Sequence, residues 1–225
     1  MNRSVYYAIP VLLLGACASL PKLPSLSSQS KYVEPESFKA SAFINEKSWV
    51  DFAIIGQNQV VTFDRVINGT QKSDFVLEST NRNTWVIQLR YTGDPKNYID
   101  CGRILSKVKT PEGEHRYEFP AAKAHQQYQI QRDDKLYSID RRMNLDISAI
   151  LTFEVLSPSR TRVKVDSQYT ATRDQSYQDG NGKPIGMTDK VSFNFRDSGA
   201  TFSNAATKCR ATGQFELDVL ALAKR

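Results

Sequence analysis

The chain has 225 residues, of which 40% are hydrophobic and 24% charged, and its formal net charge at pH 7 is +6. This length is enough for one sizeable core or two small ones. The basic residues are scattered, with no Lys/Arg run longer than Arg141-Arg142. The composition therefore argues against a dedicated nucleic-acid function, and it leaves a mildly basic surface for anionic lipid headgroups or an acidic partner.

The first residues have the layout of an export signal. Arg3 and the free amine make a positive start, and residues 5–14 are almost wholly apolar. A transmembrane helix needs roughly 20 apolar residues. The apolar stretch here is shorter and contains Pro10 and Gly15. We therefore expect residues 1–16 to be a signal peptide rather than a membrane span.

The tetrapeptide Leu14-Gly15-Ala16-Cys17 closes this segment. It resembles the lipobox of bacterial lipoproteins, in which a diacylglycerol is attached to the cysteine thiol and the preceding peptide bond is cut. The resemblance implies that Cys17 is the lipidated N-terminus of the mature chain, anchored stably by two or three acyl chains. No Asp follows the cysteine, which by the same resemblance implies the outer membrane. The alternative is a soluble secreted protein with a cysteine near its cleavage site.

Residues 17–42 are predicted to be the lipidated cysteine and a disordered tether, because serines and prolines dominate and no periodicity is visible. A single domain is expected over residues 43–225. Its first elements are a short helix at 45–55, with Asn45 as N-cap and a strand as the less favoured alternative, and a three-stranded meander. The meander has strands at 59–67, 73–79 and 84–92, with Asn68-Gly69 as its first hairpin turn.

The second half of the domain reads mainly as strands. A strand is predicted at 97–108, a polar loop at 109–125, and short strands at 127–131 and 135–140. Alternation of apolar and polar residues, broken in the first strand only by Ile150, makes 144–155 and 161–173 the clearest hairpin. A last strand at 190–198 precedes a C-terminal helix that Thr212 caps.

Two cysteines remain after Cys17, namely Cys101 and Cys209. An even pair in an exported chain indicates a structural disulfide. Neither residue belongs to a CxxC motif and no histidine lies near either, which disfavours a redox or metal role.

These elements predict an α+β fold in which an antiparallel β-sheet is covered by the C-terminal helix, with one disulfide. The order resembles the helix-grip domains of BamC-like lipoproteins, which belong to the outer-membrane β-barrel assembly machine. The shared features are the lipobox, the tether, the paired strands and the terminal helix. No residue-level motif carries the resemblance, so it implies no functional residues.

Catalytic and metal-binding patterns are weak. His115 with Glu112 and Glu114 is the best metal-ligand group, and a solvated loop explains it better. Asp146 and Glu154 are acidic strand residues that pairing with Arg162 or Lys164 would explain, although a carboxylate pair distant in sequence stays open. We expect no catalytic residue, no metal and no cofactor.

The sequence thus predicts a non-catalytic module for protein interaction or envelope assembly, anchored in the outer membrane by its lipid and facing the periplasm. Its expected partners are the membrane and an envelope protein. The alternative is a carrier of a lipid or small hydrophobic ligand, held in a helix-grip cavity between sheet and helix. The two differ in their expected structure, because a carrier needs an empty apolar cavity, whereas a binding module needs a filled core and an exposed patch or strand edge.

Overall fold

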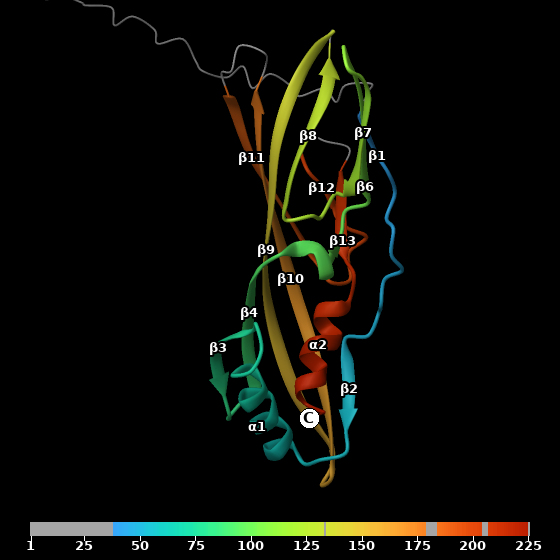
Figure 1. The fold of residues 1–225 in the computed structure, drawn as a ribbon. Helices are drawn as coiled ribbons and strands as arrows, with labels where there is room; N and C mark the ends of the chain where they lie inside the picture. Colours follow the sequence, from blue (N-terminus) through green and yellow to red (C-terminus); the bar gives the residue numbers. More distant parts are fainter. Residues whose placement is uncertain (1–37, 133, 179–183, 204–206, 225) are drawn as a thin grey trace, which may run out of the picture. The chain divides into compact units, whose positions relative to one another are not determined.

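Two long antiparallel strands run through the computed structural model of the protein, which describes residues 38–132, 134–178, 184–203 and 207–224. The described part is mostly β-strand in several antiparallel sheets, with two short α-helices (Figure 1). The predicted α+β, helix-grip-like fold is therefore wrong. The strands are longer and more numerous than expected, and the terminal helix has only 9 residues.

The long strands are β9 (Lys135–Ser157) and β10 (Arg160–Gln178), with 23 and 19 residues. Their burial alternates residue by residue, so odd-numbered side chains such as Leu145, Ile147 and Val165 form a buried inner face. The hairpin predicted from alternation is confirmed, and the pairing extends as far as Ser138↔Gln178.

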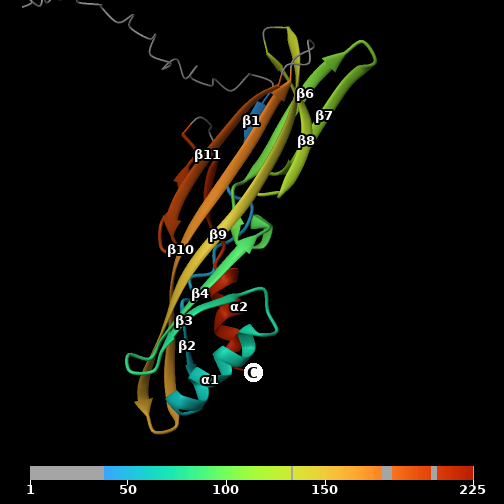
Figure 2. The ribbon, with the colours of Figure 1, turned by 90° about the vertical axis from the view of Figure 1, so that its left-hand side faces the viewer.

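Five further strands complete this sheet (Figure 2). Two of them pair with the edge of β10 that faces away from β9. Two others pair with the edge of β9 that faces away from β10. The strands that pair with β10 are β11 (Pro184–Asn194) and β2 (Phe52–Ile55). Those on the side of β9 are β4 (Val86–Gly93), with β3 (Val76–Asn81) beyond it, and β8 (His125–Arg132).

The segment predicted as the first meander strand is instead helix α1 (Gln59–Thr70). The side chain of Asn58 caps it by accepting a hydrogen bond from Val61 N at 2.9 Å. Thr62, Phe63 and Val66 are buried at helical spacing. The β-branched residues that suggested a strand are compatible with a helix because packing of this face outweighs their modest propensity cost.

Asn68-Gly69 is not a hairpin turn, since it lies in the last turn of α1. A Cβ atom on Gly69 would lie 3.1 Å from Cδ2 of Leu222. The glycine therefore allows close packing of α1 against helix α2 (Gln214–Leu222). The residue before α2 is Gly213, with φ 87°, so Thr212 is not its N-cap residue.

Two smaller sheets lie beside the main one. The predicted loop 109–125 is wrong, because Thr110 and Gly113 close a hairpin between two 8-residue strands. The helix predicted at 45–55 is also wrong, and its last four residues form β2. One of the smaller sheets contains β1 (Phe38–Ala40), β6 (Arg103–Thr110) and β7 (Gly113–Pro120). The other contains β5 (Ile99–Asp100), β12 (Ala200–Thr201) and β13 (Lys208–Ala211). A short 3-10 helix, η1 (Pro95–Asn97), precedes β5.

Strand β1 lies inside the segment assigned to the tether, and it pairs with β6 through Phe38↔Ser106 to Ala40↔Ile104. Residues 17–37 lie outside the described residues, as do the signal segment and Cys17.

The disulfide between Cys101 and Cys209 is confirmed. Both cysteines are buried, and the bond joins the chain between β5 and β6 to β13, shortly before α2 begins. It therefore fixes the approach to the terminal helix across a sequence separation of 108 residues.

Replacing both cysteines (Cys101→Ser with Cys209→Ser) should lower the free energy of unfolding by about 2–5 kcal/mol, because the unfolded chain loses a long covalent loop. Urea unfolding of the two proteins measures the difference. Reductant should weaken the wild type and leave the double variant unchanged. Equal stability of both proteins under oxidising conditions would contradict the structural role.

Candidate interaction surface

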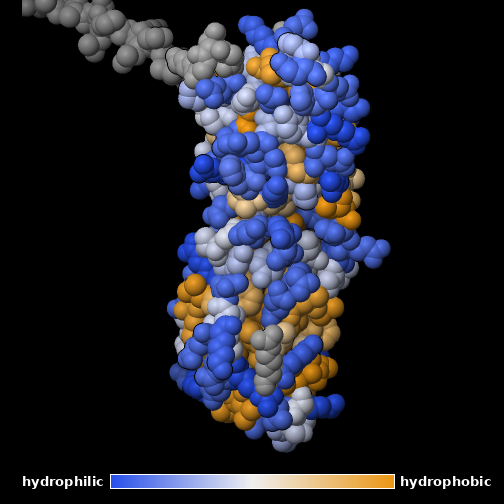
Figure 3. Space-filling model, viewed as in Figure 1, coloured by the Kyte–Doolittle hydropathy of each residue, from blue (hydrophilic) through white to orange (hydrophobic). Residues whose placement is uncertain are grey.

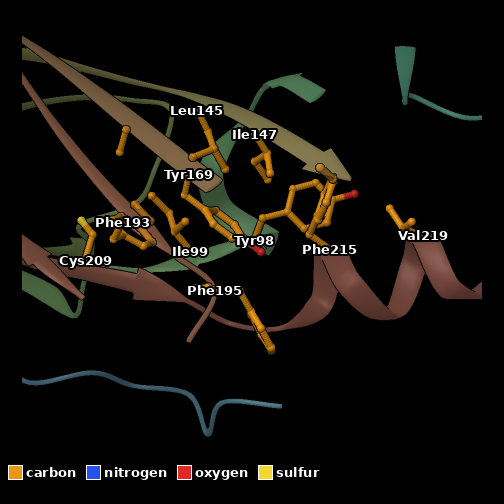
Figure 4. Packing of buried hydrophobic residues seen from close by; sticks show 14 of the residues in the cluster. Tyr98, Ile99, Leu145, Ile147, Tyr169, Phe193, Phe195, Cys209, Phe215 and Val219 are labelled. Carbon is orange, nitrogen blue, oxygen red and sulfur yellow. The ribbon is translucent and has the colours of Figure 1, made fainter. Parts of the chain in front are cut away.

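The space between the main sheet and α2 is filled by aromatic side chains (Figure 4). The ring of Phe215 on α2 lies 5.4 Å from Phe75, 5.6 Å from Tyr98 and 6.2 Å from Tyr169, between centroids. Tyr169 also stacks on Phe193 at 5.4 Å. These contacts are those of a packed core rather than of a ligand cavity.

Buried polar groups tie α2 to the sheet at the same place. Glu216 is fully buried and accepts hydrogen bonds from Ser167 and, at 2.7 Å, from the hydroxyl of Tyr169. Burial raises the pKa of Glu216, while the two hydrogen bonds oppose the shift. Glu216 thus joins the helix to the sheet. The two described histidines, His115 and His125, belong to other strands, β7 and β8. We therefore interpret Glu216 as a structural residue.

The opposite face of the sheet is open and largely polar. A hollow of about 370 Å³ lies on it, where β11 ends and β2 begins along β10. Ile150, Phe195 and Arg196 are among its lining residues. Arg196 forms an ion pair with the buried carboxylate of Asp51, which holds the two strand ends together.

Strand β2 lies at the edge of the sheet next to this hollow. It pairs with β10 on one side, and no other described strand pairs with it. Four apolar side chains in and before β2 are between 45% and 61% exposed. These residues, which we define as the β2 surface, are Trp49, Val50, Phe52 and Ile54.

Neighbouring residues extend this hydrophobic area. Trp49 contacts Phe195 of the hollow, with ring centroids 6.3 Å apart. Ile150 of β9 is exposed and lines the same hollow. Figure 3 shows hydrophobic surface over the part of the molecule that contains β2 and α1. The exposed patch is therefore larger than the β2 surface alone.

Basic groups border the patch. The guanidinium of Arg162 lies over the ring of Phe52 at 5.8 Å, and Nζ of Lys47 lies over that of Trp49 at 4.2 Å. Arg162 also pairs with Glu154 at 2.9 Å, and Lys164 with Asp166 at 2.8 Å. An apolar centre with a charged rim is the usual anatomy of a protein interface.

The other candidates from the sequence are not brought together. His115, Glu112 and Glu114 belong to the β6–β7 hairpin, and the described residues contain no group of three or more metal ligands. Glu154 pairs with Arg162 as expected, whereas Asp146 pairs with Arg90 instead of Arg162 or Lys164. Both carboxylates are thus explained by cross-strand pairing.

The β2 surface was missed because residues 45–55 were predicted to form a helix. The only available signal is the run of four apolar residues Phe52-Ala53-Ile54-Ile55. That pattern marks a strand but does not show which of its faces is covered.

Comparisons of the chain with family models, curated proteins and solved structures found no match. Among the described residues, no helix has the length and apolar character needed to cross a membrane. The interpretation of the surface therefore rests on its own geometry.

The carboxyl group of Glu216 should give stability a recognisable pH dependence. Its pKa is raised in the folded protein, so the fold gains from its protonation at low pH. This contribution is lost as pH rises from the ordinary value near 4.5 through the folded pKa. We expect the free energy of unfolding of Glu216→Gln, relative to wild type, to increase between pH 4 and pH 8.

Denaturant titrations at several pH values measure this difference. Glu46→Gln serves as the control, because Glu46 is exposed. A pH-independent difference between Glu216→Gln and wild type would show that the carboxyl group does not have a raised pKa.

Proposed function

We propose that the protein is a lipoprotein of the outer membrane that faces the periplasm and binds an envelope protein through the β2 surface, without catalysis. The tetrapeptide Leu14-Gly15-Ala16-Cys17 supports lipidation at Cys17. The disulfide between Cys101 and Cys209 supports export, because such bonds persist in oxidising compartments.

The unpaired edge of β2, with its exposed apolar side chains, carries the interaction part of the proposal. Edge strands in soluble proteins are usually protected by charges, prolines or bulges, because they can pair with another chain. Within Phe52–Ile55 there is no charge and no proline. An extended segment of a partner can add here as a further strand and place apolar side chains against Phe52 and Ile54.

The carrier alternative depends on a cavity between the sheet and the terminal helix. The aromatic contacts of Phe215 occupy that space, so no observation favours a carrier over an interaction module. The patch is apolar at its centre and charged at its rim, and this arrangement favours a protein partner.

Substituting Ile54→Asp should abolish recovery of the partner in a crosslinking pull-down from native membranes, because a charge is placed at the centre of the β2 surface. Ile185→Asp is a matched control, since Ile185 is an exposed apolar residue on β11. Both variants should keep wild-type thermal stability. Equal recovery of the partner with Ile54→Asp and Ile185→Asp would contradict the proposed surface. Capture of a second copy of this chain alone would show self-association and would contradict binding of an envelope protein.

Substituting Cys17→Ala should release the protein from the membrane fraction, because the acyl chains supply the anchor. Mass spectrometry of the mature N-terminal peptide should find a diacylglyceryl group on Cys17 in the wild type. An unmodified Cys17, or retention of residues 1–16, would contradict the proposed localisation while leaving the β2 surface open to a separate test.

A further inference from the structure

Two arginines, Arg141 and Arg173, are buried on the inner face of the main sheet. Arg141 lies on β9 between the buried residues Ile139 and Met143, and its side chain has no solvent exposure. The alternation of β9 places it there, since odd-numbered side chains of this strand point inward. A guanidinium in this position is unusual, because buried charges are normally paired.

No protein group in the described structure pairs with this guanidinium. Nε, Nη1 and Nη2 of Arg141 are all buried and have no hydrogen-bond partner. The neighbouring Arg173 is satisfied, because its Nε and Nη2 donate to the two carboxylate oxygens of Asp189 at 3.0 and 2.6 Å. Its guanidinium also lies 4.6 Å from the ring of Phe202. The nearby carboxylate is thus already engaged by another arginine.

The charge on Arg141 persists at neutral pH. Burial, together with the nearby charge of Arg173, lowers the pKa of Arg141 to about 10, although Tyr128, Tyr177 and Asp189 oppose the change. The guanidinium is therefore still protonated at pH 7. Leaving one such charge buried without a counterion is strongly unfavourable. A counterion from outside the chain would remove most of that cost.

The surroundings of Arg141 are suited to hold a polar ligand. The strand register places Gln126 of β8 and Gln175 of β10 directly opposite it on either side. Both belong to the face of Arg141, and the hydroxyl of Tyr177 donates to Oε1 of Gln175 at 2.9 Å. The side chain of Gln126 is engaged by Lys123 and by the carbonyl of Gln127. The polar groups that flank the guanidinium on this face are therefore those of Gln175 and Tyr177 on β10, as in sites where a few polar groups orient a ligand.

We propose that Arg141 binds the carboxylate of a small organic ligand at the inner face of the sheet, between β8 and β10. One positive charge lacks a partner, so a monoanion balances it, whereas a phosphate dianion would leave excess negative charge. The planar guanidinium fork also matches a carboxylate in two parallel hydrogen bonds. This site is separate from the β2 surface and does not depend on the proposed partner.

Thermal unfolding of the mature protein at pH 7 tests the proposal, with sodium acetate and sodium benzoate as probes and sodium chloride at matched ionic strength as reference. Ligand that binds only the folded state raises the melting temperature in a saturable way. We expect this rise with the carboxylates in the wild type and in Arg142→Met. Arg142 is the matched control, because its side chain is 70% exposed and it follows Arg141 on the opposite face of β9.

In Arg141→Met the rise should disappear. Because this variant also removes an unpaired buried charge, it is expected to fold and to be at least as stable as the wild type without ligand. Arg141→Lys provides a second test, since it keeps the charge but loses the fork, and should need at least about tenfold more carboxylate. A rise that is absent in the wild type, equal in Arg141→Met, or produced by phosphate but not by carboxylates would overturn the proposal.

Discussion

The pairing of β9 with β10 is the constraint on which the rest of the structure depends. Their ladder runs from Ser138↔Gln178 at one end to Ser157↔Arg160 at the other, and it presents one continuous buried face that is apolar except at a few positions such as Arg141 and Arg173. A one-residue slip would turn that whole face toward solvent, so burial of the inner side chains fixes the register. Helices α1 and α2 then have one surface against which to pack, and Phe215 and Glu216 attach α2 to it by ring contacts and hydrogen bonds.

The length of β10 also determines where the sheet is open. Its edge pairs with β11 along Gln168–Gln178 and with β2 along Thr161–Lys164. The two shorter strands leave a gap between their ends, and the ion pair of Asp51 with Arg196 bridges that gap. Strand β2 is thereby left as an edge with exposed apolar residues beside a hollow. The same alternation that buries the core also carries Arg141 inward at the other end of β9. One strand pair thus positions both of the features that we connect with function.

Local sequence signals predicted the elements that depend on period alone. The alternation in residues 144–155 and 161–173 identified the central hairpin, and the paired cysteines identified the disulfide. Local sequence signals failed where tertiary contacts decide the secondary structure. An example is α1, whose β-branched residues are held in a helix by the Asn58 cap and by close packing at Gly69. The β2 surface was not predictable, because pairing of Phe52 with Lys164 is a long-range contact. Arg141 was predictable in part, since its odd position in β9 marks it as inward-facing.

Hydrogen exchange of the backbone amides of Phe52–Ile55 tests the central claim most directly, because a partner strand added to β2 must engage its free edge. Exchange should be measured on the protein in its native membranes and on the purified protein alone. The account predicts that the β2 amides that point away from β10 are protected only in the membranes, while amides of β11, which lies on another stretch of the β10 edge, exchange alike in both samples. Identical exchange of the β2 amides in the two samples would contradict it.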